Sequence, residues 1–180
     1  MQSLKGKFLI SSSTLKEDNF VQTVVFLIEH NEEGAFGLVV NRPLDSSLHD
    51  VLPKLSSKSK NVLIYEGGPV RPEVLFVLFH SDTKDVDGEE VIENVYLGTS
   101  LDLLEQLIES EKAFHVYHGY AGWAASQLEE EIVAKTWVVA EGNTNIIFHE
   151  NPEVVWREAL LYSGGIYSYF AKNVKDPFLN

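Results

Sequence analysis

The sequence predicts a single α+β domain, in which a mixed, mostly antiparallel sheet is flanked by helices. Its 180 residues are about one domain's worth of chain. Strand-like segments outnumber helix-like segments and do not alternate strictly with them, which disfavours a doubly wound sheet. The Ser/Lys stretch at residues 56–60 is too short to separate two domains. We therefore expect one domain over residues 1–180, with a frayed tail from about residue 172 to 180.

The clearest local structure is an antiparallel hairpin formed by residues 21–28 and 36–41, joined by a polar loop at residues 31–34. Both arms are rich in β-branched and aromatic residues, and the loop contains Asn and Gly. Because the arms are apolar at nearly every position, we expect both faces to be covered. Further strands are expected at residues 62–65, 74–79, 91–97, 114–117, 136–140 and 145–149.

Three helices are predicted: from a cap at residue 99 or 100 to about 109, across residues 124–134, and from 151 to the glycines at 164 and 165. The last has the strongest start signal, because Asn151 can cap it, Pro152 fits its first position and Glu153 favours its positive end. A short helical stretch is expected after residue 46 or 47. The acidic residues 82–93 show no apolar period and are expected to form a solvated loop.

Charge and composition exclude several classes of protein. There are 27 Asp and Glu against 14 Lys and Arg, a net charge of −13, which disfavours binding to nucleic acid. The absence of Cys excludes disulfides, thiolate nucleophiles and cysteine zinc sites. The apolar runs at residues 8–10 and 74–79 are too short for a signal peptide core or a membrane span. We therefore expect a cytoplasmic protein without a membrane partner.

Three turns that follow strands are the candidate ligand-binding segments. Residues 41–43 combine a turn-forming amide, a guanidinium fork and a proline of fixed φ. Residues 67–69 hold two glycines that permit positive φ or close backbone approach. Residues 119–123 are expected to connect a strand to the helix that carries Gln127, where free N–H groups could bind an anion or a carbonyl. Taken singly, each turn is more often structural than functional. The candidate site consists of Asn41, Arg42, Pro43, Gly67, Gly68, Pro69, Gly119, Tyr120, Gly122, Trp123 and Gln127.

No catalytic residue, cofactor or metal site is predicted from the motifs. His115 and His118 are an odd number of residues apart in an expected strand and should point to opposite faces. The carboxylates of residues 129–131 are interpreted as a solvated helix face. One alternative stays open, a hydrolase that uses His80 with Asp82 or Glu29.

A second alternative is direct binding to nucleic acid. Arg42, Arg71 and the lysines within residues 54–60 could hold phosphates, and tryptophans could stack on bases. For Trp137 and Trp156, packing in the core is the preferred interpretation.

A series of segments along the chain forms one recognisable pattern: residues 6–10, 18–20, 23–30, 34–43, 67–70, 80, 97–98, 119–123, 127–132 and 137. In this order, the segments resemble the AlgH/YqgE family of bacterial proteins. The resemblance covers nearly the whole chain from Gly6 to about Gly165. It implies a single α+β domain whose mixed sheet curls into an incomplete barrel flanked by helices. The resemblance also implies no established enzymatic activity or cofactor, and one branch of the family is linked to regulation of alginate production.

Together, these observations favour a non-enzymatic binding or regulatory protein. The absence of an assembled catalytic motif and the polar, glycine-rich turns point to a site that binds rather than reacts. We expect its partner to be a small molecule, a peptide or a protein of unknown identity.

Overall fold

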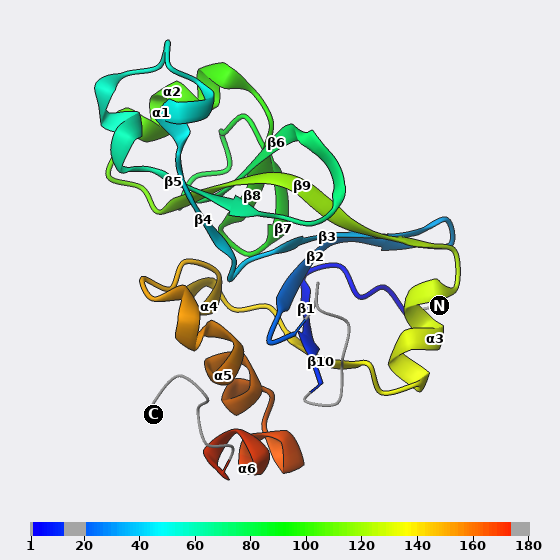
Figure 1. The fold of residues 1–180 in the computed structure, drawn as a ribbon. Helices are drawn as coiled ribbons and strands as arrows, with labels where there is room; N and C mark the ends of the chain where they lie inside the picture. Colours follow the sequence, from blue (N-terminus) through cyan, green and yellow to red (C-terminus); the bar gives the residue numbers. More distant parts are fainter. Residues whose placement is uncertain (1, 13–20, 174–180) are drawn as a thin grey trace.

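The computed structural model describes residues 2–12 and 21–173. Its strands form one curled, ten-stranded sheet with helices around it (Figure 1). The strands are β1 Lys7–Ser11, β2 Val24–Asn31, β3 Gly34–Val39, β4 Pro43–Ser47, β5 Leu63–Glu66, β6 Val70–His80, β7 Glu89–Ile92, β8 Val95–Gly98, β9 Phe114–Ala124 and β10 Trp137–Glu141. Their order is β10-β1-β2-β3-β9-β6-β8-β7, and β5 joins β4 to β9. All pairs are antiparallel except the parallel pair of β5 with β9.

The curl brings β7, at one end of the sheet, against the chain that enters β1 near the other end. Lys5 Nζ donates to a carboxylate oxygen of Glu89 in β7. A Cβ placed on Gly6 would lie only 2.5 Å from Cγ2 of Ile92, so glycine is needed for this approach. The predicted α+β domain with a sheet curled into an incomplete barrel is confirmed.

The predicted hairpin is also confirmed. The strands β2 and β3 pair antiparallel and are joined by a tight turn at Glu32 and Glu33. The register shifts between Leu27 and Glu29, which marks a β-bulge at Ile28. Strand β1 pairs with the other side of β2 and was not predicted, because its apolar run is short. Cover on both faces explains why residues 24–28 are all buried.

Most expected helices are present. They are α1 Leu48–Val51, the 3-10 helix η2 Ser57–Asn61, α2 Leu101–Glu109, α3 Gln127–Val133, α4 Thr144–Ile147, α5 Pro152–Ser163 and α6 Gly165–Asn173. The caps of two helices are the predicted ones, since Ser100 accepts from the Leu103 N–H and Asn151 from the Glu153 N–H. Helix α6 was not predicted and follows α5 directly after Gly164.

Three local predictions were wrong. Residues 145–149 are not a strand, because the Asn143 side chain accepts from the N–H groups of Asn145 and Ile146 and starts α4. Residues 91–97 are two strands, because Asn94 takes a positive φ of 62° and turns β7 into β8. The predicted acidic loop, residues 82–93, is therefore shorter, since residues 89–92 form β7 and pair with β8.

The segment at residues 119–123 is not a connection to a helix. Strand β9 continues to Ala124 because residues 121–124 pair with β3, with Gly122 opposite Phe36. Helix α3 begins only at Gln127, after Ser126 with a φ of 68°. The predicted helix start at residue 124 is thus three residues too early.

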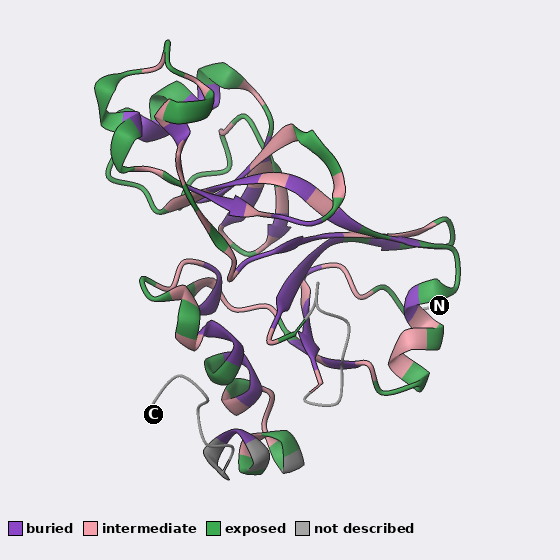
Figure 2. Ribbon diagram, viewed as in Figure 1, coloured by how far each residue is buried: buried purple, intermediate pink, exposed green. Residues whose placement is uncertain are grey.

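The main core lies between the sheet and α5 (Figure 2). Trp137 and Trp156 are buried, as predicted, and the Trp156 indole donates to the Ser11 carbonyl at 3.0 Å. Figure 1 places α1 and α2 at the far end of the sheet from α5 and α6. A second core cluster joins α2 to Val77 and Phe79 of β6 and to Val116 of β9.

Two predictions touch residues without a described structure. Residues 18–20 and the tail from 174 to 180 lie outside the described residues, whereas Asn173 ends α6. Within residues 2–12 and 21–173, no helix combines the length and the apolar character that crossing a bilayer requires.

Candidate functional site

The three predicted segments come together through contacts between their backbones. We call this place the backbone crossing and define it as residues 41–43, 67–69 and 119. The Glu66 N–H donates to the Arg42 carbonyl at 2.8 Å. The Val39 N–H donates to the Gly67 carbonyl, and the Gly67 N–H to that of His118, each at 2.9 Å. The sequence therefore singled out segments that converge in the fold.

Glycines at the backbone crossing make room for neighbouring backbone. A Cβ on Gly67 would lie 2.3 Å from the Gly119 carbonyl oxygen. One on Gly68, where φ is 150°, would lie 2.2 Å from the Tyr120 carbonyl carbon. Gly119 takes a φ of 65°, and a Cβ there would lie 2.4 Å from the Gly68 carbonyl oxygen. All three glycines are buried, so their contacts hold β5, β6 and β9 together.

The polar side chains of the crossing contact the chain that enters β2. Asn41 accepts from the Val24 N–H at 2.9 Å and donates to the Gln22 carbonyl at 2.8 Å. Arg42 donates to Thr23 Oγ1 at 2.8 Å. Pro43 and Pro69 are exposed beside these turns. The contacts of Asn41 and Arg42 stabilise a local turn, and a ligand-binding role for them stays a prediction.

A second place gathers three of the remaining predicted residues, without Gln127, in a cavity of about 360 Å³, which we call the aromatic cleft. It lies across the hairpin end of the sheet, where Glu29 pairs with Phe36 and Phe36 with Gly122. Its lining is Glu29, Asn31, Glu33, Gly34, Ala35, Phe36, Val70, Tyr120, Gly122 and Trp123. Tyr120, Gly122 and Trp123 were predicted site residues. The others were not, because only the pairing of four strands, β2, β3, β9 and β6, brings them together.

Aromatic rings form the floor of the cleft. The rings of Phe36 and Tyr120 meet edge to face at 5.1 Å between centroids. Phe76 supports both rings, at 5.5 Å from Phe36 and 6.1 Å from Tyr120. Gly122 is exposed, and a Cβ there would meet nothing closer than the Tyr120 ring at 3.2 Å. The missing side chain therefore leaves the ring surface open to a ligand.

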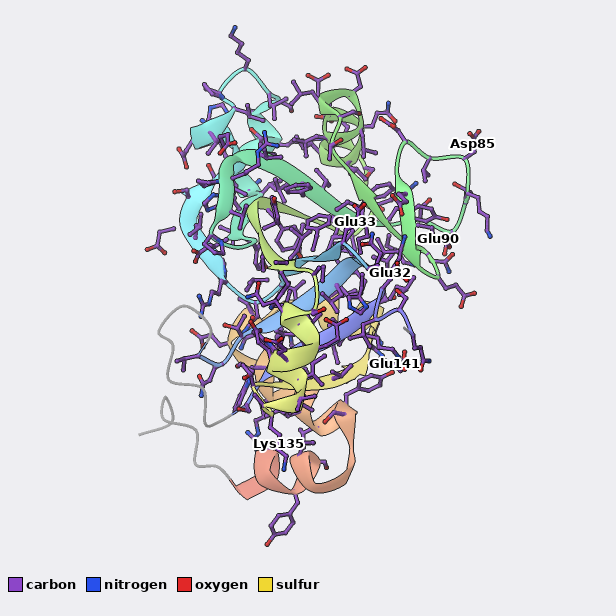
Figure 3. All side chains as sticks on the ribbon, turned by 90° about the vertical axis from the view of Figure 1, so that its right-hand side faces the viewer. Glu32, Glu33, Asp85, Glu90, Lys135 and Glu141 are labelled. Atoms are coloured by element: carbon purple, nitrogen blue, oxygen red, sulfur yellow. The ribbon has the colours of Figure 1, made fainter. Side chains whose placement is uncertain are left out.

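Acidic side chains form the rim of the cleft. Glu29 accepts from the Asn31 side-chain amide at 2.7 Å, and Asn31 accepts from the Glu33 N–H at 2.8 Å. These contacts order the turn that carries Glu33. Figure 3 looks at this end of the molecule, and Glu32 and Glu33 lie near its centre. The cleft thus combines ring surface with negative charge.

Behind the cleft, Glu131 of α3 binds two tryptophans. One carboxylate oxygen accepts from the indole N–H of Trp123 at 2.8 Å and from that of Trp137 at 2.7 Å. The other accepts from Gln127 at 2.9 Å, and Gln127 in turn accepts from the Ala124 N–H. Gln127 therefore positions the end of β9.

The interpretation of residues 129–131 as a solvated face was therefore wrong for two of them. Besides Glu131, Glu129 contacts Nε2 of the buried His30 at 2.9 Å. His30 Nδ1 accepts from the Leu4 N–H, so Nε2 carries the proton and donates to Glu129. Glu130 alone is exposed. Both carboxylates have structural roles that sequence could not show, since their partners lie on distant strands.

A third place, which we call the histidine cavity, has a volume of about 490 Å³ and contains His80 and His149. His80 Nε2 lies 3.8 Å from a carboxylate oxygen of Asp82, whose side chain is 87% exposed. The His149 ring accepts from the Asn151 N–H at 3.0 Å. Glu29, the other predicted partner of His80, lines the aromatic cleft instead. Among the described residues, no three His, Asp or Glu side chains form a group suited to a metal ion.

His115 is half-buried beside that cavity. Its ring stacks on Tyr65 at 4.5 Å between centroids and meets the Phe148 ring at 5.4 Å. Burial lowers the pKa of His115 to about 4, although a hydrogen bond to the Ile147 backbone opposes the shift. His115 is therefore neutral at pH 7 and serves as a core residue.

Three of the cations proposed for nucleic acid have partners within the protein. Arg71 Nε donates to Glu73 at 3.1 Å, and Lys58 Nζ to Glu109 at 2.6 Å. Arg42 contacts Thr23, as described above. Two of these three partners are carboxylates, which offset the charge of the cation, and the nucleic-acid alternative stays a prediction.

Comparison with known proteins identifies the family. A model described as AlgH-like matches residues 8–168. A UPF0301 protein of Cytophaga hutchinsonii is 33% identical, covering 98% of each chain, and one of Hahella chejuensis is 39% identical over 82% of each. The solution structure of the AlgH protein from Pseudomonas aeruginosa superposes with a TM-score of 0.78, at 33% identity over 97% of this chain and 96% of that one.

A crystal structure of a protein from Corynebacterium diphtheriae has a TM-score of 0.79 at 19% identity, covering 95% of this chain and 92% of that one. At that identity the likeness concerns the fold alone. The matches to the AlgH-like model and to the curated relatives each extend over most of the sequence. The chain therefore belongs to the AlgH-like family of bacterial proteins.

Proposed function

We propose that the protein is a non-enzymatic binding or regulatory protein of the cytoplasm, and that the aromatic cleft is its ligand site. One observation carries this proposal: Gly122 leaves the rings of Phe36 and Tyr120 uncovered in a cavity of about 360 Å³. This volume lies within the usual range for small-ligand sites, from about 300 to 1,000 Å³. Aromatic surface with a few polar groups is the usual lining of such sites.

Binding is better supported than hydrolysis. A general base needs an oriented partner within hydrogen-bond reach. The 3.8 Å contact of His80 with Asp82 is longer than a hydrogen bond, and the Asp82 side chain is mostly in water. The carboxylate of Glu29 belongs to a different cavity. In the aromatic cleft, by contrast, the groups that would contact a ligand already line one space.

A screen with small fragments tests the proposed site. Neutral, anionic and cationic fragments are offered to the wild type and to Gly122→Leu, and binding is detected by ligand NMR. We expect at least one fragment to lose about tenfold or more in affinity, because the leucine fills the space over the rings. Ala125→Leu introduces the same leucine side chain at an exposed position outside the cleft and should change nothing.

The same screen decides the role of the backbone crossing. The sequence predicts that Arg42→Ala weakens binding while the fold stays intact. If Arg42→Ala loses affinity and Gly122→Leu does not, the crossing rather than the cleft is the ligand site. Equal binding by every variant would contradict a role for either place. Location is tested separately, by fractionating cells that express the tagged protein, where the soluble cytoplasmic fraction should contain it.

A further inference from the structure

We propose that the aromatic cleft recognises an organic cation, which means an ammonium or guanidinium group carried on an apolar stem. A lysine or arginine side chain and a free polyamine share this chemistry. The inference rests on the proposed function, since it assumes that the cleft is the ligand site. It adds the charge and shape of the ligand, which the proposed function leaves open.

The aromatic floor supplies the first reason. Ring faces carry negative charge from the π electrons and attract cations that lie above them. In the cleft, Phe36 and Tyr120 meet edge to face at an interplanar angle of 85°, and both residues line the cavity. Gly122 lies directly across from Phe36 in the register and adds no side chain over the rings. A cationic head group could therefore contact ring surface there.

The charge of the rim supplies the second reason. Glu29 and Glu33 are acidic, and among the described residues that line the cleft none is Lys, Arg or His. Glu29 already accepts one hydrogen bond from Asn31 and keeps further acceptor capacity, since a carboxylate offers about four lone-pair sites. The protein's net charge of −13 also favours the approach of cations. An anionic ligand would have to lie against two carboxylates.

The apolar walls supply the third reason, because they distinguish an organic cation from a metal ion. Ala35, Phe36 and Val70 line the cleft beside the carboxylates and can pack against an alkyl stem. A hard metal ion prefers six or more oxygen ligands and gains nothing from rings. No group of three metal-binding side chains occurs among the described residues, here or elsewhere. The lining therefore suits a long side chain with a charged end.

Matched probes test the inference. Nα-acetyl-lysine methylamide carries the ammonium, Nα-acetyl-norleucine methylamide has an apolar chain without it, and Nα-acetyl-glutamate methylamide carries a negative charge. Affinities are measured by ligand NMR at about 150 mM salt, where charges more than about 8 Å apart are largely screened. We expect the lysine probe to bind about tenfold tighter than the norleucine probe. Spermidine in a parallel titration distinguishes a free amine from a peptide side chain, since the natural source should bind tighter.

Matched variants locate the charge that matters. Glu33→Gln removes a carboxylate from the rim, and we expect it to weaken the lysine probe about fivefold, with little change for norleucine. Glu32→Gln removes the same charge from the neighbouring residue in the turn, which does not line the cleft, and should change affinity less than about twofold. Equal effects of the two substitutions would show attraction by net charge alone and would overturn the inference.

The remaining outcomes separate this inference from the proposed function. If the norleucine or glutamate probe binds as tightly as the lysine probe and Gly122→Leu abolishes that binding, the cleft is a ligand site but not for cations. If none of the cationic probes binds, the inference is overturned, and the fragment screen still decides the proposed function. If Gly122→Leu still binds the cationic probes, these probes bind outside the aromatic cleft. Both the inferred cation site and the proposed position of the ligand site are then contradicted.

Discussion

Strand β9 contributes one glycine to the backbone crossing and one to the aromatic cleft, and the two glycines have different roles. At the backbone crossing, Gly119 is buried with a positive φ and lies against the backbone of Gly68. In the aromatic cleft, Gly122 is exposed, and a Cβ there would have only side-chain neighbours, the Tyr120 ring at 3.2 Å and Cγ2 of Val70 at 3.9 Å. The comparison shows that a glycine-rich motif needs its surroundings before it can be assigned to folding or to binding.

The largest expected effect is that of an alanine at the crossing. Gly68→Ala places a Cβ about 2 Å from the backbone of β9 at a φ that alanine rarely adopts. We expect a loss of more than about 4 kcal/mol in unfolding free energy, or failure to fold. Gly122→Ala is the matched control and should change stability by less than about 1 kcal/mol, since its Cβ meets only a ring edge. Urea denaturation compares them, and equal losses would break the comparison.

Next in size is the carboxylate that supports the cleft from behind. Glu131→Ala withdraws the acceptor that binds the indole N–H groups of Trp123 and Trp137, both of which are buried. We expect a loss of about 3 kcal/mol, because hydrogen bonds to a charged acceptor inside a protein are costly to leave unmade. Glu130→Ala, on the exposed face of α3, should cost less than about 0.5 kcal/mol. Denaturation followed by tryptophan fluorescence measures both, and a Glu131→Ala value as small as that control would contradict this role.

A comparable loss of unfolding free energy should appear as the pH falls. The pKa of His115 is about 4 in the folded protein and about 6.5 when unfolded. The unfolded chain therefore takes up this proton first, and the stability due to neutral His115 is complete above about pH 6.5 and lost progressively toward pH 4. The total is about 3 kcal/mol. His115→Gln should show a flatter loss of stability over this range than the wild type, and parallel curves would contradict the assignment.

The smallest expected effect is at the polar part of the crossing. Arg42→Ala removes a hydrogen bond to Thr23 Oγ1 and a longer one to the Val21 carbonyl. Since Arg42 is partly exposed, we expect a loss of about 1 kcal/mol and an unchanged fold. Thermal unfolding measures it. A loss as large as that of Gly68→Ala would mean that the side chain, and not the glycine contacts, holds the crossing together.

The sequence predicted the features that depend on local signals. The hairpin, the cap of α2 and the cap of α5 follow from residues within one segment, and each was confirmed. The strand predicted at residues 145–149 failed because the side chain of Asn143, just before it, starts a helix instead. The predicted end of β9 was too early, because only pairing with β3 keeps residues 121–124 in the strand.

The candidate site was predictable to a smaller extent. Tyr120, Gly122 and Trp123 were identified from one glycine-rich motif, and all three line the aromatic cleft. Glu29, Phe36 and Val70 join them only through the register of β2, β3, β9 and β6, which no spacing along the chain encodes. The alternation of the hairpin could have indicated that Glu29 and Asn31 share a face. It could not have indicated the rings beside them.

Chemical-shift mapping tests the division between the two regions most directly. Backbone amide signals are recorded while Nα-acetyl-lysine methylamide is titrated into the wild-type protein. We predict that the largest shift changes occur at residues 29–36 and 120–123, which border the aromatic cleft, and that Arg42 and Gly68 at the backbone crossing change little. Largest changes at the crossing, with the hairpin end unchanged, would contradict the account.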